Sequence, residues 1–371
     1  MEGDHIKIWH WLRPFSWLYG IGVCIRNILF DSGVLKSERF KIPVICIGNI
    51  TAGGTGKTPH TEYLVRLLSK NLHVAVLSRG YKRKSKGLVL AQKDTPMEQI
   101  GDEPFQMKQK YPNITLAVDK NRRRAIHRLC ESDIKPPVDV VLLDDAFQHR
   151  YVTPGLSILL MDYHRLIYFD ELLPSGRLRE PRSSSRRADI VIVTKCPTYI
   201  TPMEQHGIER SLEIGPWQRL FFTRFKYGNL RNLQSQREIG LDELTDGMYN
   251  VILFTGIASP QQMEYDLKKY CSFRSIHFAD HHAFTQKDIE EIITNVTEAE
   301  RNAKPTILVT TEKDAARLSF LQKGTEQHDW FPERLRKNIY MLPIEVVFLD
   351  EQEQEFNKII SDYVRKNSRN G

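Results

Sequence analysis

The sequence lacks any apolar run of about 18 to 20 residues, the length that a helix needs to cross a lipid bilayer. It also lacks a Cys-x-x-Cys pair. Its five cysteines are scattered and odd in number, which disfavours a disulfide framework and a zinc site. This cysteine pattern makes a reducing cytosolic setting the default expectation. No cleavable signal peptide is visible. Any membrane role must then come from a local segment.

Acidic residues are outnumbered by basic ones, 46 Asp and Glu against 53 Lys and Arg, and the formal net charge is +7. This excess favours anionic partners such as nucleotides, phosphorylated substrates, nucleic acid or acidic lipid, and charge alone does not choose among them. The hydrophobic content of 41% and the charged content of 27% are typical of a soluble globular protein. A chain of 371 residues favours two domains over one.

The start of the chain is rich in tryptophan. Three of the five tryptophans, Trp9, Trp11 and Trp17, lie there, and apolar residues recur at helical spacing from Leu18 to Leu29. Tryptophan favours the headgroup region of a bilayer, so a helix lying in the membrane interface is one interpretation. A helix packed on the protein's own core is the other, and the pattern does not choose between them.

The stretch that begins at Lys41 predicts a phosphate-binding loop. A buried strand from Pro43 to Gly48 is followed by a glycine-rich loop and by an amphipathic helix that begins near Pro59. In this order the loop N–H groups and the helix N-terminus converge on an anion. The expected nucleotide contacts are Thr51, Ala52, Gly53, Gly54, Thr55, Gly56, Lys57 and Thr58.

Two residues of this loop have distinct expected roles. Lys57 would reach the outer phosphates, and the Thr58 hydroxyl would hold Mg²⁺. The usual pattern has a glycine five residues before Gly56, where this chain has Thr51, so the loop is interpreted as a variant. A plain glycine-rich turn before a helix is the alternative.

Acids and bases follow the ends of several predicted strands. Asp144 and Asp145 come directly after the apolar run 140–143, which is typical of a strand whose terminal acid orders Mg²⁺, although two surface acids are the alternative. The loop that begins at Arg79 carries five cations and is either a clamp for a phosphorylated substrate or a solvated turn. Asp102 and Glu103 precede a helix, where they either cap it or face the γ-phosphate.

Strands and helices alternate along the chain, which predicts an α/β fold with a mostly parallel, doubly wound sheet and a second, smaller α/β domain. The stretches near 219–227 and 339–349 are expected to pair as a two-stranded connection. The predicted divisions are an N-terminal helix at 1–38, a nucleotide-binding domain at 39–218, a linker strand at 219–230, the smaller domain at 231–338, and a return strand with a C-terminal helix at 339–371.

Asp280, His281 and His282 form the one carboxylate–imidazole cluster of the predicted smaller domain. Their spacing is not that of a metal site, and spacing alone does not distinguish them from residues that are adjacent by chance. A histidine near a catalytic aspartate would tune the basicity of that aspartate, which is the functional alternative.

Six segments together resemble the tetraacyldisaccharide 4'-kinases, which phosphorylate the lipid A precursor in Gram-negative bacteria. The segments are, in chain order, VICIGNITAGGTGKTP, LSRGYKRKSKG, GDEP, DDAFQHR, LPSGRLREP with SRRAD, and FADHHAF. A generic phosphate-binding loop would match the first alone, and the position of Thr51 agrees with this family's loop. Ala146 departs from the family, which usually has glycine there, and leaves both aspartates in place.

The resemblance implies a kinase that uses ATP and Mg²⁺ to phosphorylate the 4'-hydroxyl of a tetraacylated glucosamine disaccharide 1-phosphate, giving lipid IVA. It implies a peripheral or monotopic enzyme on the cytoplasmic face of the inner membrane, with residues 1–38 as the membrane-associating helix. No nucleic acid and no obligate protein partner are expected.

The resemblance also implies roles for single residues. Asp102 matches the general base and His281 the histidine that pairs with it, while Lys57 and Asp145 complete the catalytic set. Asp144 and Asp145 match the acids around Mg²⁺, and Arg79 belongs to the basic loop left for the substrate's 1-phosphate. The matched supporting positions are Tyr81, Glu103, Gln148, Arg179 and Glu180.

Two rival functions stay open at this point. Another P-loop enzyme, such as a ligase or kinase of a small soluble acid or a nucleotide-driven metal chaperone, would share the loop and the strand-end acids. A nucleotide-switched membrane-binding module would share the aromatic start as well.

Overall fold

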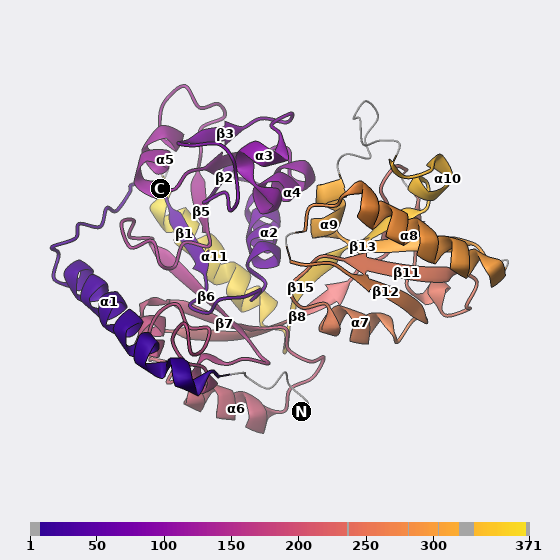
Figure 1. Ribbon diagram of the computed structural model, residues 1–371. Helices are drawn as coiled ribbons and strands as arrows, with labels where there is room; N and C mark the ends of the chain where they lie inside the picture. The colour runs from indigo at the N-terminus through magenta and orange to yellow at the C-terminus, as the bar shows by residue number, and fades with distance from the viewer. Residues whose placement is uncertain (1–7, 236, 281, 303, 319–329, 369–371) are drawn as a thin grey trace. The chain divides into compact units, whose positions relative to one another are not determined.

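The computed structural model describes residues 8–235, 237–280, 282–302, 304–318 and 330–368 (Figure 1). The chain forms two compact units. The first comprises the chain up to Phe225 together with the chain from Val346 onward, and the second is Lys226–Glu345. The second unit therefore extends beyond both ends of the range 231–338 expected for the smaller domain. Each unit has its own sheet and its own buried core.

The first unit is built on a nine-stranded sheet in the order β15-β8-β7-β6-β1-β5-β2-β4-β3. Its strands are β1 Val44–Gly48, β2 Val74–Ser78, β3 Val89–Ala91, β4 Thr115–Val118, β5 Val140–Asp144, β6 Leu156–Asp162, β7 Ile190–Thr194, β8 Arg219–Tyr227 and β15 Ile344–Phe348. Neighbouring strands of this sheet pair in parallel from β8 through β7, β6, β1, β5 and β2 to β4, and β3 pairs antiparallel with β4. The central strands are buried along their whole length, which explains their continuous apolar sequences. The predicted α/β fold with a mostly parallel sheet is confirmed.

The position of β1 determines where a ligand can bind. The chain passes from β1 to β2 and then to β5 on one side of β1, and it continues with β6 and β7 on the other side. In open α/β sheets, ligands bind at the carboxyl ends of the strands where the strand order reverses in this way. The register pairs Ile47 of β1 with Asp144 of β5, so the loops after these two strands begin side by side.

Helices cover both faces of this sheet. They are α1 Arg13–Asp31, α2 Lys57–Leu68, α3 Met97–Ile100, α4 Asp102–Lys110, α5 Arg122–Leu129, α6 Pro202–Ser211 and α11 Glu353–Asn367, with short 3₁₀ turns at His10–Leu12, Ile167–Phe169 and Arg182–Arg187. Figure 1 shows the yellow α11 lying on the sheet beside α2. Tyr63 of α2 donates to Glu353 and contacts the ring of Phe356, so the end of the chain completes the core that begins with the phosphate-binding loop.

The second unit has a six-stranded sheet in the order β10-β9-β14-β13-β11-β12. Its elements are β9 Leu230–Asn232, β10 Glu238–Ile239, β11 Asn250–Thr255, α7 Gln261–Leu267, β12 Phe273–His277, α8 Gln286–Ala299, β13 Thr306–Thr311, α9 Glu312–Arg317, α10 Glu333–Arg336 and β14 Ile339–Leu342, with 3₁₀ turns at Asp242–Leu244 and Glu300–Asn302. A capping box between Thr285 and Asp288 begins α8. β14 pairs with β13 and β9 here, so of the stretch 339–349 only β15 lies next to β8.

Candidate active site

The phosphate-binding loop joins β1 to α2, and α2 begins at Lys57, slightly before the predicted Pro59. Asn49 Nδ2 donates to Thr55 Oγ1 (2.9 Å), and Thr194 Oγ1 of β7 donates to the carbonyl of Thr55 (2.9 Å). Gly56 has a φ of 81°, and a Cβ there would lie 2.6 Å from Cζ of Phe225. Only glycine combines this left-handed backbone with so close a neighbour at low cost. Strand β7 and the loop itself thus hold Thr55, two residues before Lys57.

A second segment runs along the first half of the loop. Ala52 N donates to the carbonyl of Arg177 (2.6 Å), and Arg179 N donates to the carbonyl of Ile50 (2.7 Å). Between them Thr51 forms an antiparallel bridge with Leu178. Because this pairing needs extended backbone, Thr51 is suited to a position where the usual pattern has glycine. The variant loop therefore has a physical explanation.

Asp145 lies between two cations at the end of β5. Its Oδ1 is 3.6 Å from Nζ of Lys57, and its Oδ2 is 3.6 Å from Nη1 of Arg179. Asp145 adopts a φ of 46°, an uncommon value for a residue with a side chain, which turns the chain sharply after the strand. The predicted strand-end acid and the predicted loop lysine are thus neighbours. Arg179 reaches them from the segment that pairs with the loop.

Asp144 is buried beside Asp145, with only 3% of its surface exposed. It accepts a hydrogen bond from Thr61 Oγ1 of α2 (3.1 Å). Burial, the largest cause, and the carboxylates of Glu103 and Asp145 together raise the pKa of Asp144 to about 7, against the opposing effects of Lys57 and the Thr61 hydrogen bond. A buried acid beside two partly exposed ones, Asp145 and Glu103, leaves an excess of negative charge that a cation would relieve.

The residues present fit Mg²⁺, which takes oxygen ligands and often uses only one or two carboxylates together with phosphate oxygens and water. Asp144, Asp145 and the Thr58 hydroxyl would supply such oxygens. Oδ1 of Asp145 is buried and accepts no hydrogen bond from any described residue. Within the described part of the chain, no group of three or more His, Cys, Asp or Glu side chains is placed to hold a metal.

Asp102 is the first residue of α4, and its Oδ1 accepts the backbone N–H of Glu103 (2.9 Å). The preceding Gly101 has a φ of 93°, and a Cβ there would lie 2.8 Å from the carbonyl of Tyr81. The basic loop that carries Arg79 and Tyr81 therefore packs against the start of α4. Because Glu103 acts on the pKa of Asp144, the start of α4 also faces the end of β5. Gly101 is the N-cap of α4 and offers no side chain to cap the helix, so Asp102 does not cap the helix from before it but accepts an N–H within the first turn. The role of Asp102 as a base stays a prediction.

Two predicted supporting residues make contacts within the first unit. Gln148 Nε2 donates to the carbonyl of Asn49 at the start of the loop (2.7 Å). Glu180 is 1% exposed and pairs with Arg187 (2.5 Å) and Arg26 of α1 (3.9 Å). Both side chains brace the site in the described structure, and substrate contact by either one stays a prediction.

The carboxylate–imidazole cluster belongs to the second unit. Asp280 Oδ1 lies 3.7 Å from Nζ of Lys313, and His282 Nε2 is 2.8 Å from Oδ2 of Asp288. The ring of His282 also stacks on Phe278 at a centroid distance of 5.2 Å. His281 lies outside the described residues, so its predicted pairing with a catalytic base stays a prediction.

One buried cation of the site was missed by the sequence analysis. Arg122 begins α5 after the end of β4 and is 3% exposed, and its Nε has no hydrogen-bond partner among the described residues. Burial lowers the pKa of Arg122, as does Arg79, while Asp145 and Asp144 act in the opposite direction. The sequence does contain a signal for this residue, because Arg122 follows the end of a predicted strand, at the same edge of the sheet as the two aspartates.

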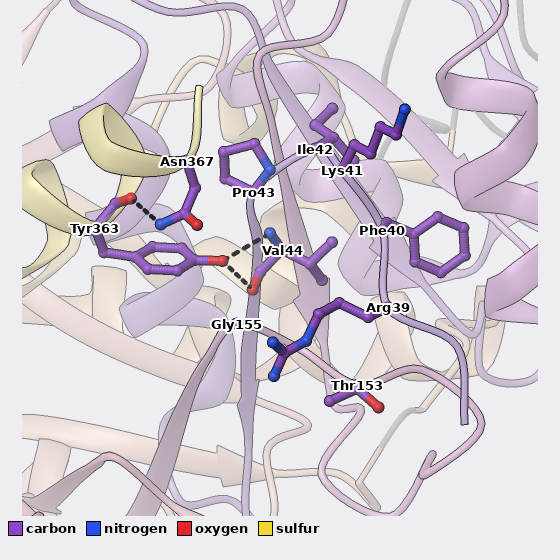
Figure 2. Close-up of a pocket in the computed structure, with 10 residues that line it drawn as sticks. All are labelled: Arg39, Phe40, Lys41, Ile42, Pro43, Val44, Thr153, Gly155, Tyr363 and Asn367. Atoms are coloured by element: carbon purple, nitrogen blue, oxygen red, sulfur yellow. Dashed lines mark hydrogen bonds between the residues drawn. The ribbon is translucent and has the colours of Figure 1, made fainter. Parts of the chain in front are cut away.

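A cavity of about 230 Å³ lies elsewhere, at the amino end of β1 (Figure 2). There the Tyr363 hydroxyl of α11 donates to the carbonyl of Val44 (3.1 Å) and lies 3.1 Å from the Val44 N–H. The phosphate-binding loop follows the opposite, carboxyl end of β1. The cavity is therefore not part of the candidate active site.

The contact of Asp145 with Lys57 places this chain in the class of P-loop proteins that act on nucleotide phosphates. Comparison with known proteins narrows that class. Residues 8–365 match the family model for the Tetraacyldisaccharide-1-P 4'-kinase. The chain belongs to this family of kinases.

Three relatives that share the name tetraacyldisaccharide 4'-kinase show how far the similarity extends. The protein from Phocaeicola vulgatus is 54% identical over 372 residues, covering 100% of this chain and 99% of the relative. Those from Bacteroides thetaiotaomicron and Flavobacterium psychrophilum are 50% and 42% identical and cover 100% and 97% of this chain, and 97% and 98% of the relatives. A crystal structure of LpxK from Aquifex aeolicus in complex with ATP matches with a TM-score of 0.70 and 30% identity, covering 95% of this chain and 98% of the other.

Proposed function

We propose that this kinase transfers the γ-phosphate of ATP to the 4'-hydroxyl of a tetraacylated glucosamine disaccharide 1-phosphate, which gives lipid IVA in lipid A biosynthesis. Family membership supports the reaction, and the ATP in the related Aquifex aeolicus structure supports the nucleotide. The observation that carries the proposal is the position of Asp145 between Lys57 and Arg179. This arrangement places two cations and the strand-end acids beside one phosphate-binding loop.

Phosphoryl transfer needs in-line placement and neutralisation of charge more than covalent help from the protein. The loop amides from Gly53 to Thr58 and the Lys57 ammonium would bind the phosphates. Thr58, Asp144 and Asp145 would hold Mg²⁺, which supplies neutralising charge when it is bound with the nucleotide. The Arg179 guanidinium would add a second cationic contact for the transferred group.

The acceptor side would be served by the start of α4 and the basic loop beside it. Asp102 is held there by its contact with the Glu103 N–H, and we assign to it the removal of the proton from the 4'-hydroxyl. The backbone of Tyr81 packs next to it at Gly101, and we assign to Arg79 and Tyr81 the binding of the disaccharide, with Arg79 near the 1-phosphate. His281 would tune the basicity of Asp102.

Helix α1 supports a membrane location for this reaction. Trp17 and Leu18 are 71% and 69% exposed, whereas Ser16 on the opposite face is buried and donates to the carbonyl of Leu172 (3.0 Å). No helix within the described residues has the length and apolar character that spanning a bilayer requires. We propose that the exposed apolar face of α1 lies in the lipid interface at the cytoplasmic face of the inner membrane.

The same helix is connected to the phosphate-binding loop. Arg26 of α1 donates to the carbonyl of Gln148 (2.6 Å), and Gln148 donates in turn to the carbonyl of Asn49 (2.7 Å). A membrane-bound α1 would therefore hold the nucleotide site close to a lipid substrate.

The test is ATP consumption by the purified chain with Mg²⁺ and detergent, with and without the acylated disaccharide 1-phosphate. We expect consumption to depend on the disaccharide and to be lost in Lys57→Met. The disaccharide without its 1-phosphate serves as the matched control and should react more slowly. Equal consumption with no disaccharide present would contradict the proposal and favour a plain ATPase.

A further inference from the structure

Two aromatic side chains project from the loop between β6 and β7. Tyr168 and Phe169, here called the aromatic tip, are 48% and 58% exposed at the end of a short 3₁₀ turn. Ile167, the first residue of that turn, is 3% exposed and packs in the core with Leu166 and Leu178. The loop is thus anchored by one apolar side chain and exposes the next two.

The backbone that carries the aromatic tip is held firmly. Asp170 is 1% exposed and accepts hydrogen bonds from Nε and Nη2 of Arg165 (2.7 and 3.0 Å) and from the N–H of Arg177 (3.0 Å). Arg182 donates to the carbonyl of Asp170 (3.0 Å), and its guanidinium carbon lies 5.3 Å from the centre of the Tyr168 ring. Such a loop exposes its rings without a large entropic cost on binding.

The aromatic tip is continuous with the start of α1. Glu171 pairs with Arg13 of α1 (2.7 Å), and the backbone of Ser175 accepts the N–H of Trp9 (2.9 Å). Glu171 lies two residues after Phe169, which is at most about 7 Å along an extended chain. Trp9, itself 45% exposed, and the aromatic tip therefore flank the same short segment of one rigid unit.

We propose that the aromatic tip enters the headgroup region of an anionic bilayer beside α1 and forms a second membrane contact of the first unit. This inference rests on the proposed membrane role of α1. Aromatic rings favour the interface, and the Arg182 guanidinium beside the Tyr168 ring could meet a lipid phosphate there. A helix that lies in the interface is free to roll about its own axis. A second contact off that axis fixes the roll and so fixes how the carboxyl edge of the sheet faces the lipid.

The experiment measures partition of the full chain onto vesicles of phosphatidylcholine and phosphatidylglycerol by sedimentation over a range of lipid concentration. The double variant Tyr168→Ser/Phe169→Ser should partition about tenfold more weakly, a change expected for two lost interfacial rings. Tyr265→Ser is the matched control, because Tyr265 is 63% exposed with Lys269 Nζ 4.9 Å from its ring centre, and it belongs to the second unit. That variant should partition as the unchanged chain does.

A second variant guards against loss of binding through misfolding. Phe169→Trp should partition more tightly, since tryptophan favours the interface most, and a damaged fold does not produce that gain. Unchanged ATP binding in every variant shows that the loop of the first unit is intact. A Phe169→Trp chain with no gain counts against the proposal.

The variant Trp17→Ser/Leu18→Ser on α1 separates this inference from the one it rests on. If both double variants lose vesicle binding, the result supports two membrane contacts. If only Tyr168→Ser/Phe169→Ser loses vesicle binding, the result still supports the aromatic tip as a membrane contact. Loss in the α1 variant alone overturns the aromatic tip and leaves the α1 proposal standing. Full binding in both overturns the membrane role altogether.

Discussion

Replacing Gly56 by alanine tests whether the phosphate-binding loop has the conformation described. Gly56 is the residue before Lys57, with a φ of 81°. A left-handed backbone costs a residue with a Cβ about 1 to 2 kcal/mol. The new Cβ would also lie 2.6 Å from Cζ of Phe225, closer than packed atoms approach.

The magnitude follows from these two costs. The Phe225 ring is only partly buried and meets the new methyl with its far end, so we expect it to move at a cost of up to about 1 kcal/mol. Gly56→Ala should therefore lower the free energy of unfolding by about 1 to 3 kcal/mol. In a Phe225→Ala background the same change should cost only the backbone part, about 1 to 2 kcal/mol. ATP affinity should fall as well, because any relief of strain moves the amide of Lys57.

Urea unfolding followed by far-UV circular dichroism is the assay. Tryptophan fluorescence would report poorly on the unit that contains the loop, because Trp9, Trp11, Trp17 and Trp217 are 45% to 71% exposed in the folded chain. Gly56→Asn is an informative comparison, because asparagine tolerates the left-handed region better than alanine does. If Gly56→Ala unfolds at the same urea concentration as the unchanged chain, the loop does not have this conformation.

Four further predictions concern single groups of the site. Burial and the neighbouring carboxylates raise the pKa of Asp144 to about 7, so ionising this carboxyl destabilises the folded protein when no metal is bound. The loss of folding free energy is absent below about pH 4, where the carboxyl is protonated in both states, and complete above pH 7. Asp144→Asn should therefore raise the urea midpoint in EDTA at pH 8 and leave it nearly unchanged at pH 4, and an equal effect at both pH values would refute the shift. Burial lowers to about 4 the pKa of His60, a residue of α2 whose Nδ1 lies 2.8 Å from the carbonyl oxygen of Gly56. Stability present above pH 6.5 should therefore be lost as the pH falls toward 4, and His60→Asn should show a smaller loss over that range in the same assay. Arg122→Met should cut turnover at least tenfold, an order of magnitude typical of a lost charge at a phosphate site. The thermal midpoint should stay equal or rise, because a poorly compensated buried cation is removed. A lower midpoint with normal turnover would show a purely structural role. Asp102→Asn should lower turnover by about 10² while ATP affinity, measured by calorimetry, is retained, and normal turnover would remove the assignment of Asp102 as the base.

Much of the site could be predicted because its signals are local. The glycines before Lys57 and the apolar run before Asp144 lie within a few residues of the groups they position, and both predicted segments are strands followed by functional loops. Parallel strands bring their carboxyl ends to one edge, so the proximity of Lys57 and Asp145 followed from the order of elements.

The sequence by itself therefore determined the α/β fold, the phosphate-binding loop and the strand-end acids, because the period of apolar residues and the glycines that permit unusual backbone are written within single segments. Only the tertiary structure decided that Thr51 pairs with Leu178, that Arg179 reaches Asp145, that Arg122 is buried, and that β14 joins the second sheet. Each of these contacts joins residues that are distant in sequence or depends on which strands become neighbours. Burial and pairing of that kind are set when the whole sheet assembles, and no local pattern of side chains specifies them.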